Sequence, residues 1–171
     1  LVMIGGPNAF GAGGYQNSAV ERALPVSMDI KQRKILPRGA LALILHTCEL
    51  PSGNAWARDI GIAAPEVLSA PDRMGGLLYD YQRGEDWLYP IQPVRDKNMM
   101  RGKLRSAQPG DMPDVQTTLQ MAYDGLKVAN AAVKRVVIIS DGDPGGPTQA
   151  LLNALAAAKI TVSTVCIAPH S

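Results

Sequence analysis

Four aspartates have the residue type and the spacing of a cation site. Asp141 and Asp143 follow an apolar run in "VVIISDGDP", residues 136–144, and Asp111 and Asp114 stand in "GDMPD". Hard cations such as Mg²⁺ and Ca²⁺ prefer several oxygen ligands, which four carboxylates could supply. Asp-Gly and Asp-Pro pairs are also common turn sequences, so Asp141 or Asp143 could instead cap a helix that starts at Pro147.

A second group of reactive side chains stands in "HTCE", where His46, Thr47 and Cys48 follow another apolar run. A cysteine just beyond a strand is well placed for a nucleophile, and His46 or His170 could act as its base. However, "LHTCELP" lacks the flanking glycines of a nucleophile elbow, and buried cysteines often do no chemistry. A cysteine hydrolase or amidotransferase-like enzyme is therefore the alternative interpretation.

Strands that alternate with helices must position both groups. Three apolar runs predict strands. The run 40–46 is typical of a strand covered on both faces, 135–140 of a central strand, and the run 161–168 predicts the last strand. Residues 75–81 and 86–92 predict a hairpin around Gly84. This order predicts an α/β, Rossmann-like fold with a mostly parallel sheet, helices on both faces and one antiparallel edge strand. Ligands of such folds bind at the carboxyl ends of the strands, where both groups are expected.

Helical spacing predicts which face of each helix packs on the sheet. Four helices are expected, with Pro65 a possible kink in the first and Asp96 an N-cap for the second. The inward faces are expected to be Trp56, Ile60, Ala63 and Val67; Met100, Leu104 and Ala107; Val115, Leu119, Ala122 and Leu126; and Leu151, Leu155 and Ala158.

Three segments together resemble the von Willebrand factor A domain, over about residues 38–168. "ALALILHTCE" is similar to its first strand, "GDMPDVQTTLQMAYDGL" to its central loop and following helix, and "RVVIISDGDP" to its fourth strand and acidic turn. The resemblance implies a metal-ion-dependent adhesion site. That site takes D-x-S-x-S after the first strand, a threonine in the central loop and an aspartate after the fourth strand, and an acidic side chain from a partner often completes it.

This chain departs from that pattern at most ligand positions. Asp141 matches the last aspartate, but the first motif falls on His46, Cys48 and Leu50, and "GDMPD" has no threonine. Imidazole and thiol groups suit softer metals than Mg²⁺. We therefore expect a degenerate site with no cofactor, in which Asp141 is the ligand if Mg²⁺ or Ca²⁺ binds at all. A water, a backbone N–H, Thr47 or His46 is expected where the cation would sit.

The resemblances also suggest a domain organisation. Residues 1–28 resemble the tail of a class I glutamine amidotransferase-like domain, residues 29–39 read as a linker, and residues 40–171 form the von Willebrand factor A-like domain. This pairing resembles large membrane-anchored bacterial proteins. The second domain is expected to lack its last helix and strand, so that the strand at 161–168 becomes a sheet edge, covered by "LVMI" or by another copy of the chain.

Composition narrows the class of function. The net charge is +2, from 17 basic and 15 acidic residues, which gives no electrostatic footprint for nucleic acid. No apolar run reaches the roughly 18 residues of a membrane span. The strand order of the resembled family implies that the strand at 135–140 lies between the strand before Cys48 and the strand that carries Cys166. The two cysteines are therefore expected to stay unbonded. The sequence thus predicts a non-enzymatic protein–protein interaction module of a larger protein.

Overall fold

The computed structural model describes residues 18–23, 38–46, 52–142 and 145–167. The chain divides into two units, Leu1–Leu36 and Pro37–Ser171. In the first unit, the structure describes the short helix α1 (Ala19–Ala23). The predicted linker lies mostly outside the described residues, so that assignment stays a prediction. None of the described helices is long and apolar enough to cross a lipid bilayer.

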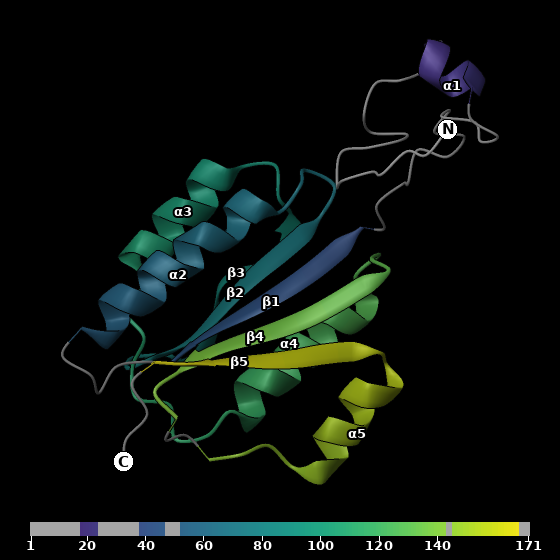
Figure 1. The fold of residues 1–171 in the computed structure, drawn as a ribbon. Helices are drawn as coiled ribbons and strands as arrows, with labels where there is room; N and C mark the ends of the chain where they lie inside the picture. Colours follow the sequence, from purple (N-terminus) through teal and green to yellow (C-terminus); the bar gives the residue numbers. More distant parts are fainter. Residues whose placement is uncertain (1–17, 24–37, 47–51, 143–144, 168–171) are drawn as a thin grey trace. The chain divides into compact units, whose positions relative to one another are not determined.

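The second unit is built on a five-stranded sheet in the order β3-β2-β1-β4-β5 (Figure 1). Four strands are parallel, and β3 pairs antiparallel with β2 at one edge through a turn in which Gly84 has φ of 75°. The α/β fold and its order of elements are confirmed. The strands are β1 (Gly39–His46), β2 (Arg73–Asp80), β3 (Gly84–Pro93), β4 (Val133–Ser140) and β5 (Ile160–Cys166).

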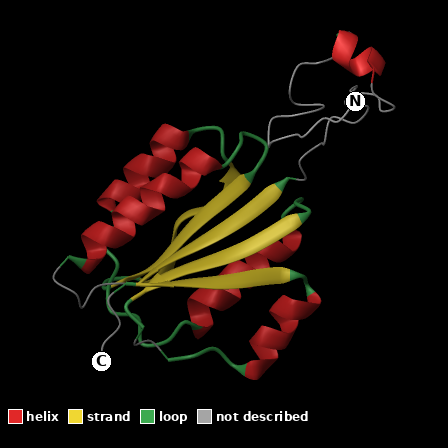
Figure 2. Ribbon diagram, in the orientation of Figure 1, coloured by secondary structure: helices red, strands yellow, loops and turns green. Residues whose placement is uncertain are grey.

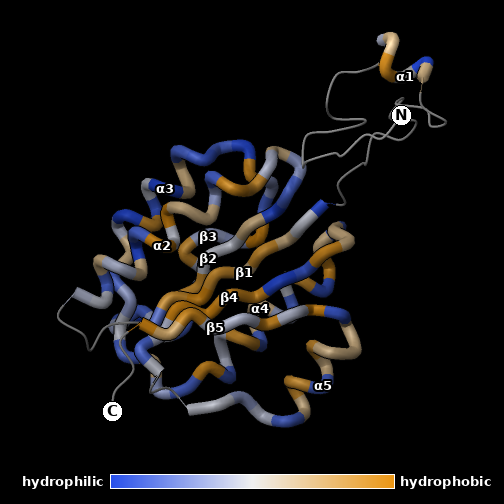
Figure 3. Tube along the Cα trace, viewed as in Figure 1, coloured by the Kyte–Doolittle hydropathy of each residue, from blue (hydrophilic) through white to orange (hydrophobic). Residues whose placement is uncertain are grey.

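Helices cover both faces of this sheet (Figure 2). The helices α2 (Gly53–Val67) and α3 (Lys97–Ser106) lie on one face, and α4 (Gln116–Val128) and α5 (Gln149–Ala157) lie on the other. The central strands are strongly apolar (Figure 3) because both of their faces are buried. In β1, Ala42 and Ile44 pack in the cluster that includes α4 and α5, while Leu43 and Leu45 pack in the cluster that includes α3.

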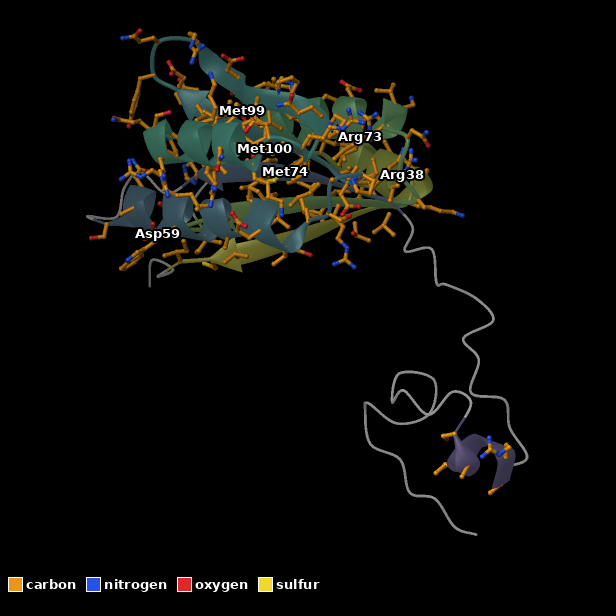
Figure 4. The ribbon with its side chains drawn as sticks, turned by 90° about the horizontal axis from the view of Figure 1, so that it is seen from above. Arg38, Asp59, Arg73, Met74, Met99 and Met100 are labelled. Atoms are coloured by element: carbon orange, nitrogen blue, oxygen red, sulfur yellow. The ribbon has the colours of Figure 1, made fainter. Side chains whose placement is uncertain are left out.

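Three of the predicted inward faces are confirmed. Met100 and Leu104 of α3 are fully buried, and Met100 lies in the same cluster as Met74 of β2 (Figure 4). Asp96 caps α3 as expected, since its side chain accepts a hydrogen bond from Met99 N at 2.8 Å. The predicted face of α4 is also buried. In α5, Leu151 and Leu155 are buried, and Ala158 at the C-cap is half-buried.

The predicted face of α2 is wrong. Its larger residues point to solvent, with Trp56 46% and Val67 85% exposed, whereas its buried residues are Gly53, Ala57, Gly61 and Pro65. A Cβ atom at Gly61 would lie 3.2 Å from Leu104 Cδ2 and 3.3 Å from Leu43 Cδ2. Small residues four apart share one face of a helix and let α2 approach the sheet closely. A search for large apolar residues therefore selected the wrong side.

The strand β5 forms the other edge of the sheet. Its residues after Ile160 are exposed, and a groove of about 410 Å³ runs beside it between α4 and α5, lined by residues that include Leu119, Leu152 and Val162. The expected cover, "LVMI", lies outside the described residues and stays a prediction. As expected, β4 separates β1 from β5, and Cys166 is a free, exposed cysteine.

Candidate functional site

The carboxyl ends of β1 and β4 bring His46, Ser140 and Asp141 together. His46 is the last residue of β1 and is in register with Ser140, the last residue of β4. His46 Nδ1 lies 3.1 Å from Asp141 Oδ1 and 3.3 Å from Ser140 Oγ. The side chains of His46 and Asp141 are fully buried. Burial of a histidine and a carboxylate is tolerated when they interact with each other, so this contact holds the two strand ends together.

A sharp turn after β4 directs Asp141 inward. Gly142 has φ of 103°, a left-handed conformation that other residues adopt only with strain, and its N–H donates to Ser140 Oγ at 3.0 Å. On the neighbouring strand, Ile167 N donates to Ser140 O at 2.8 Å, and Cys166 Sγ lies 3.8 Å from Asp141 O. The backbone around Asp141 is therefore fixed from both sides.

The loop between α3 and α4, residues 107–115, brings Asp111 to the same edge. Asp111 Oδ1 lies 3.8 Å from His46 Nε2, and the side chain of Asp111 is 54% exposed. The imidazole ring thus has one carboxylate near each nitrogen, a buried one at Nδ1 and an exposed one at Nε2. Asp114 has a different role, because its carboxylate accepts a hydrogen bond from Gln116 N at 2.8 Å at the start of α4.

Contacts from α2 and β2 hold the loop in place. Asn54 Nδ2 donates to Pro109 O and Arg58 Nη1 donates to Ala107 O, both at 3.3 Å. Gly110 N donates to Tyr79 O at 2.7 Å, and a Cβ atom at Gly110 would lie 3.0 Å from the Tyr79 ring. The sequence interpretation did not single out Asn54 or Arg58. Their spacing of four residues on one helix was the available signal.

Several predicted site residues lie outside the part of the chain that the structure describes. These are Thr47, Cys48, Asp143 and His170. Their roles remain predictions.

The predicted capping role of Asp141 is wrong. The helix α5 begins at Gln149 rather than at Pro147, and its N-cap is Thr148, whose hydroxyl accepts a hydrogen bond from Leu151 N at 3.4 Å. Asp141 is separated from α5 by the whole intervening loop, and its carboxylate faces His46 instead. The acidic turn therefore contributes a buried carboxylate that faces an imidazole rather than a helix cap.

Among the described residues, the donor groups at this edge do not converge as ligands of a hard divalent cation would. No group of three or more histidine, cysteine, aspartate or glutamate side chains within the described ranges is placed to hold a metal. The imidazole stands between Asp141 and Asp111, so these carboxylates do not converge on one point. The hydroxyl of the buried Thr118 is not directed at this edge either, because it lies 3.3 Å from Val115 O and 3.4 Å from Met112 Sδ, to which it is hydrogen-bonded. Mg²⁺ takes about six oxygen ligands and Ca²⁺ about six to eight, some of them water molecules, so a site also needs protein oxygens that point at one position.

No family model matches the chain, and no curated protein matches it. Solved structures do. An aerotolerance-related membrane protein from Bacteroides fragilis is 17% identical with a TM-score of 0.60 over 75% of this chain and 66% of its own. The protein BatB from Bacteroides thetaiotaomicron is 18% identical with a TM-score of 0.60 over 75% and 65%.

A third similar structure is proximal thread matrix protein 1 from the mussel byssus, with a zinc-occupied MIDAS motif. It is 14% identical with a TM-score of 0.59 over 74% of this chain and 37% of its own. This chain thus spans less than two thirds of the length of each of these three proteins. Identities this low establish the fold alone. Within the described residues, the second unit of this chain has an α/β fold of the von Willebrand factor A type.

Proposed function

We propose that residues 40–171 form a non-enzymatic protein–protein interaction module of a larger protein, with a degenerate cation site at the carboxyl edge of the sheet. The contact between His46 Nδ1 and Asp141 Oδ1 at 3.1 Å carries the proposal. It lies at the strand ends where open α/β sheets bind their ligands. Here that edge is closed internally by an imidazole, so the partner binds without a bridging Mg²⁺ or Ca²⁺.

The names of similar proteins support an interaction role. One neighbour is described as a pilus adhesin from Lactobacillus rhamnosus, 13% identical with a TM-score of 0.52, and the mussel protein is described with a zinc-occupied MIDAS motif. In this chain the imidazole of His46 takes the place beside Asp141 that the resembled site gives to its cation. Asp141 is the one matching ligand, and Mg²⁺ gives up its water too reluctantly for a single carboxylate to bind it tightly.

The wider setting follows from the same proposal. Two similar structures come from Bacteroides species, and one of them is described as an aerotolerance-related membrane protein. We place this chain in a membrane-anchored bacterial protein, with residues 1–28 as the tail of an amidotransferase-like domain and residues 29–39 as the linker. Limited proteolysis of the full chain tests the division, with first cleavage expected within residues 29–39.

The alternative is an enzyme that uses Cys48 with His46 or His170. One observation favours it, since a histidine beside a carboxylate is the usual arrangement of a general base and its orienting group. Against it, His46 is fully buried, with a carboxylate near each ring nitrogen. The reactivity of Cys48 towards iodoacetamide at neutral pH distinguishes the enzyme from the interaction module. The C166S variant reports on Cys48 alone, and the C48S variant reports on Cys166 as the comparison thiol. A Cys48 that reacts no faster than Cys166 supports the interaction module.

Site-specific photocrosslinking tests the interaction role. A photoreactive residue replaces Gln108, on the exposed part of the loop that carries Asp111, or Asn130, at the opposite edge of the sheet. We expect a discrete protein adduct from position 108 and none from position 130, with the same yield after addition of EDTA. Equal adducts at both positions, or an adduct that disappears with EDTA, would contradict the proposal.

A further inference from the structure

We propose that the partner presents an arginine side chain, which docks on the exposed side chains of Tyr81 and Asp111. This inference rests on the proposed function, because it names the chemistry of the partner that the carboxyl edge binds. We call this set of residues the Tyr81–Asp111 surface. Asp111 connects this surface to the buried His46–Asp141 pair, because its carboxylate lies 3.8 Å from His46 Nε2.

The charge of the surroundings selects a cationic ligand. Arg83 is the basic residue of the hairpin turn, and its guanidinium is shared between Asp80, at 3.3 Å, and Asp86, at 3.0 Å. Those three residues carry one net negative charge, and Asp111 adds a second at the adjacent loop. Arg58 is bonded to the same loop, with its guanidinium directed at Ala107 O. The chain as a whole has a net charge of +2, whereas Asp80, Arg83, Asp86 and Asp111 together carry two net negative charges. Complementary charges favour encounter with a basic group and disfavour an acidic one.

The exposed ring of Tyr81, which packs on the backbone just before Asp111, favours a guanidinium over an ammonium group. Tyr81 is 71% exposed, and its ring meets the Tyr79 ring edge to face at a centroid distance of 6.3 Å. A Cβ atom at Gly110 would lie 3.1 Å from the Tyr81 ring, so the backbone that leads into Asp111 passes directly against it. A planar guanidinium can stack on tyrosine while it donates two hydrogen bonds to a carboxylate. Lysine offers a point charge without that planar fit.

The surface is held in its conformation before any partner arrives. The loop that carries Asp111 is bonded to β2 through Tyr79 O, and to α2 through Asn54 and Arg58. A preformed surface spares the entropy cost of ordering a loop on binding. Exposed tyrosines on fixed surfaces are also among the residues that most often dominate the energy of protein interfaces.

The sign of the partner's group is therefore opposite to the one that the resembled adhesion site implies. There, an acidic side chain of the partner completes the shell of a bound cation. Here, the imidazole of His46 stands beside Asp141, and the side chain exposed at the edge is a carboxylate. An acidic partner group would meet Asp111 with no cation between them and would be repelled.

Nuclear magnetic resonance on the full ¹⁵N-labelled chain tests the inference with three capped tripeptides, Gly-Arg-Gly, Gly-Lys-Gly and Gly-Glu-Gly. We expect Gly-Arg-Gly to shift the amide signals of Tyr81, Gly110 and Asp111 saturably, and Gly-Glu-Gly to leave them unchanged. Asp111→Asn should weaken the binding of Gly-Arg-Gly about 2- to 5-fold, as an exposed ion pair allows. Tyr81→Ala should weaken it by a similar factor of about 2 to 5.

Asp124→Asn is the matched control, because Asp124 is an exposed aspartate on α4 whose carboxylate is bonded to Gln120. It should leave the affinity unchanged. Equal binding of Gly-Lys-Gly overturns the choice of arginine, and binding of Gly-Glu-Gly in the presence of Mg²⁺ overturns the inference and the metal-free proposal together. No response to any peptide, alongside an EDTA-resistant adduct from position 108, overturns the arginine surface and leaves the interaction module standing.

Discussion

His46 and Asp141 form a buried pair at the junction of two parallel strands, with Nδ1 and Oδ1 3.1 Å apart. Neither side chain has access to solvent. The contact joins the last residue of β1 to the first residue after β4, so it connects the two central strands at the edge where ligands of this fold bind.

Because the two side chains are buried against each other, their contributions to stability should be coupled. Asp141→Ala and His46→Ala each leave one buried polar partner behind, and each should lower the free energy of unfolding by about 3 kcal/mol. The double variant should lose less than the sum of the two, by at least about 1 kcal/mol. Urea unfolding of the four proteins measures this coupling, and strictly additive losses would show that the contact contributes little.

Divalent cations should not bind at this edge. Calorimetric titration of the full chain with Mg²⁺, Mn²⁺ and Ca²⁺ at millimolar concentrations should give no saturable heat, because the imidazole separates the carboxylates of Asp141 and Asp111. Asp141→Ala is the control. Saturable binding that this substitution abolishes would mean that residues 47–51 or 143–144 complete a cation site.

The close approach of α2 to the sheet makes Gly61 sensitive to added volume. Gly61→Leu should destabilise the protein by about 1–3 kcal/mol, because even its Cβ atom would lie 3.2 Å from Leu104 and 3.3 Å from Leu43. The matched control is Ala63→Leu, on the exposed side of the same helix, which should change stability by less than about 0.5 kcal/mol. Thermal unfolding of both variants checks the orientation of α2. A larger loss of stability in Ala63→Leu than in Gly61→Leu would mean that the opposite face of α2 packs on the sheet.

Asp72 should make stability depend on acid pH. Its partial burial raises the pKa of the carboxyl, but hydrogen bonds from the Ser69 hydroxyl, Gly39 N and Ser69 N outweigh this effect and hold the pKa below its usual value of 3.8. A lowered pKa in the folded state stabilises the protein above the unfolded value, and this stabilisation is lost as the pH falls through the folded value.

Asp72→Asn should therefore cost roughly 1 kcal/mol at pH 7 and flatten the loss of stability below about pH 4. Asp59→Asn, at an exposed position on α2 (Figure 4), is the control for the loss of a surface carboxylate. Urea unfolding between pH 2 and pH 7 compares the three proteins. If Asp72→Asn kept the full acid dependence, another carboxyl group would be responsible for it.

Tyr89 should be replaceable by phenylalanine without loss of stability. Its hydroxyl is buried with no hydrogen-bond partner among the described residues, and desolvation raises the pKa of this group above its usual value. Removing an unsatisfied buried hydroxyl should leave the free energy of unfolding unchanged or raise it by about 1 kcal/mol. Chemical unfolding of Tyr89→Phe measures this. A loss of more than about 1 kcal/mol would reveal a partner for the hydroxyl.

The sequence predicted those parts of the fold that depend on local pattern. The apolar faces of α3 and α4 and the Asp96 cap follow from residue spacing alone, and they are observed. The buried face of α2 could not be predicted in this way. Gly61 is buried because only a small residue fits there, and this constraint comes from Leu43 and Leu104, which approach it only in the folded protein.

The same limit applies to the candidate site. Strand ends are local features, so the position of Asp141 at the carboxyl edge was predictable from the apolar run before it. Its orientation was not, because the imidazole that it faces comes from a residue 95 positions earlier in the chain. The cap of α5 was assigned to the acidic turn because aspartate is a strong capping residue, but Thr148 is nearer to the first turn of the helix.

The loop that carries Asp111 is also bonded to the segment that leads into α5. Val115 N donates to Gly145 O and Gly145 N donates to Pro113 O, both at 3.0 Å, and Thr148 N donates to Gln116 Oε1 at 2.8 Å. These bonds link two connections that are far apart in the sequence into one mechanical unit. A displacement of α5 away from α4 would therefore strain the hydrogen bonds that join its leading segment to the loop that carries Asp111.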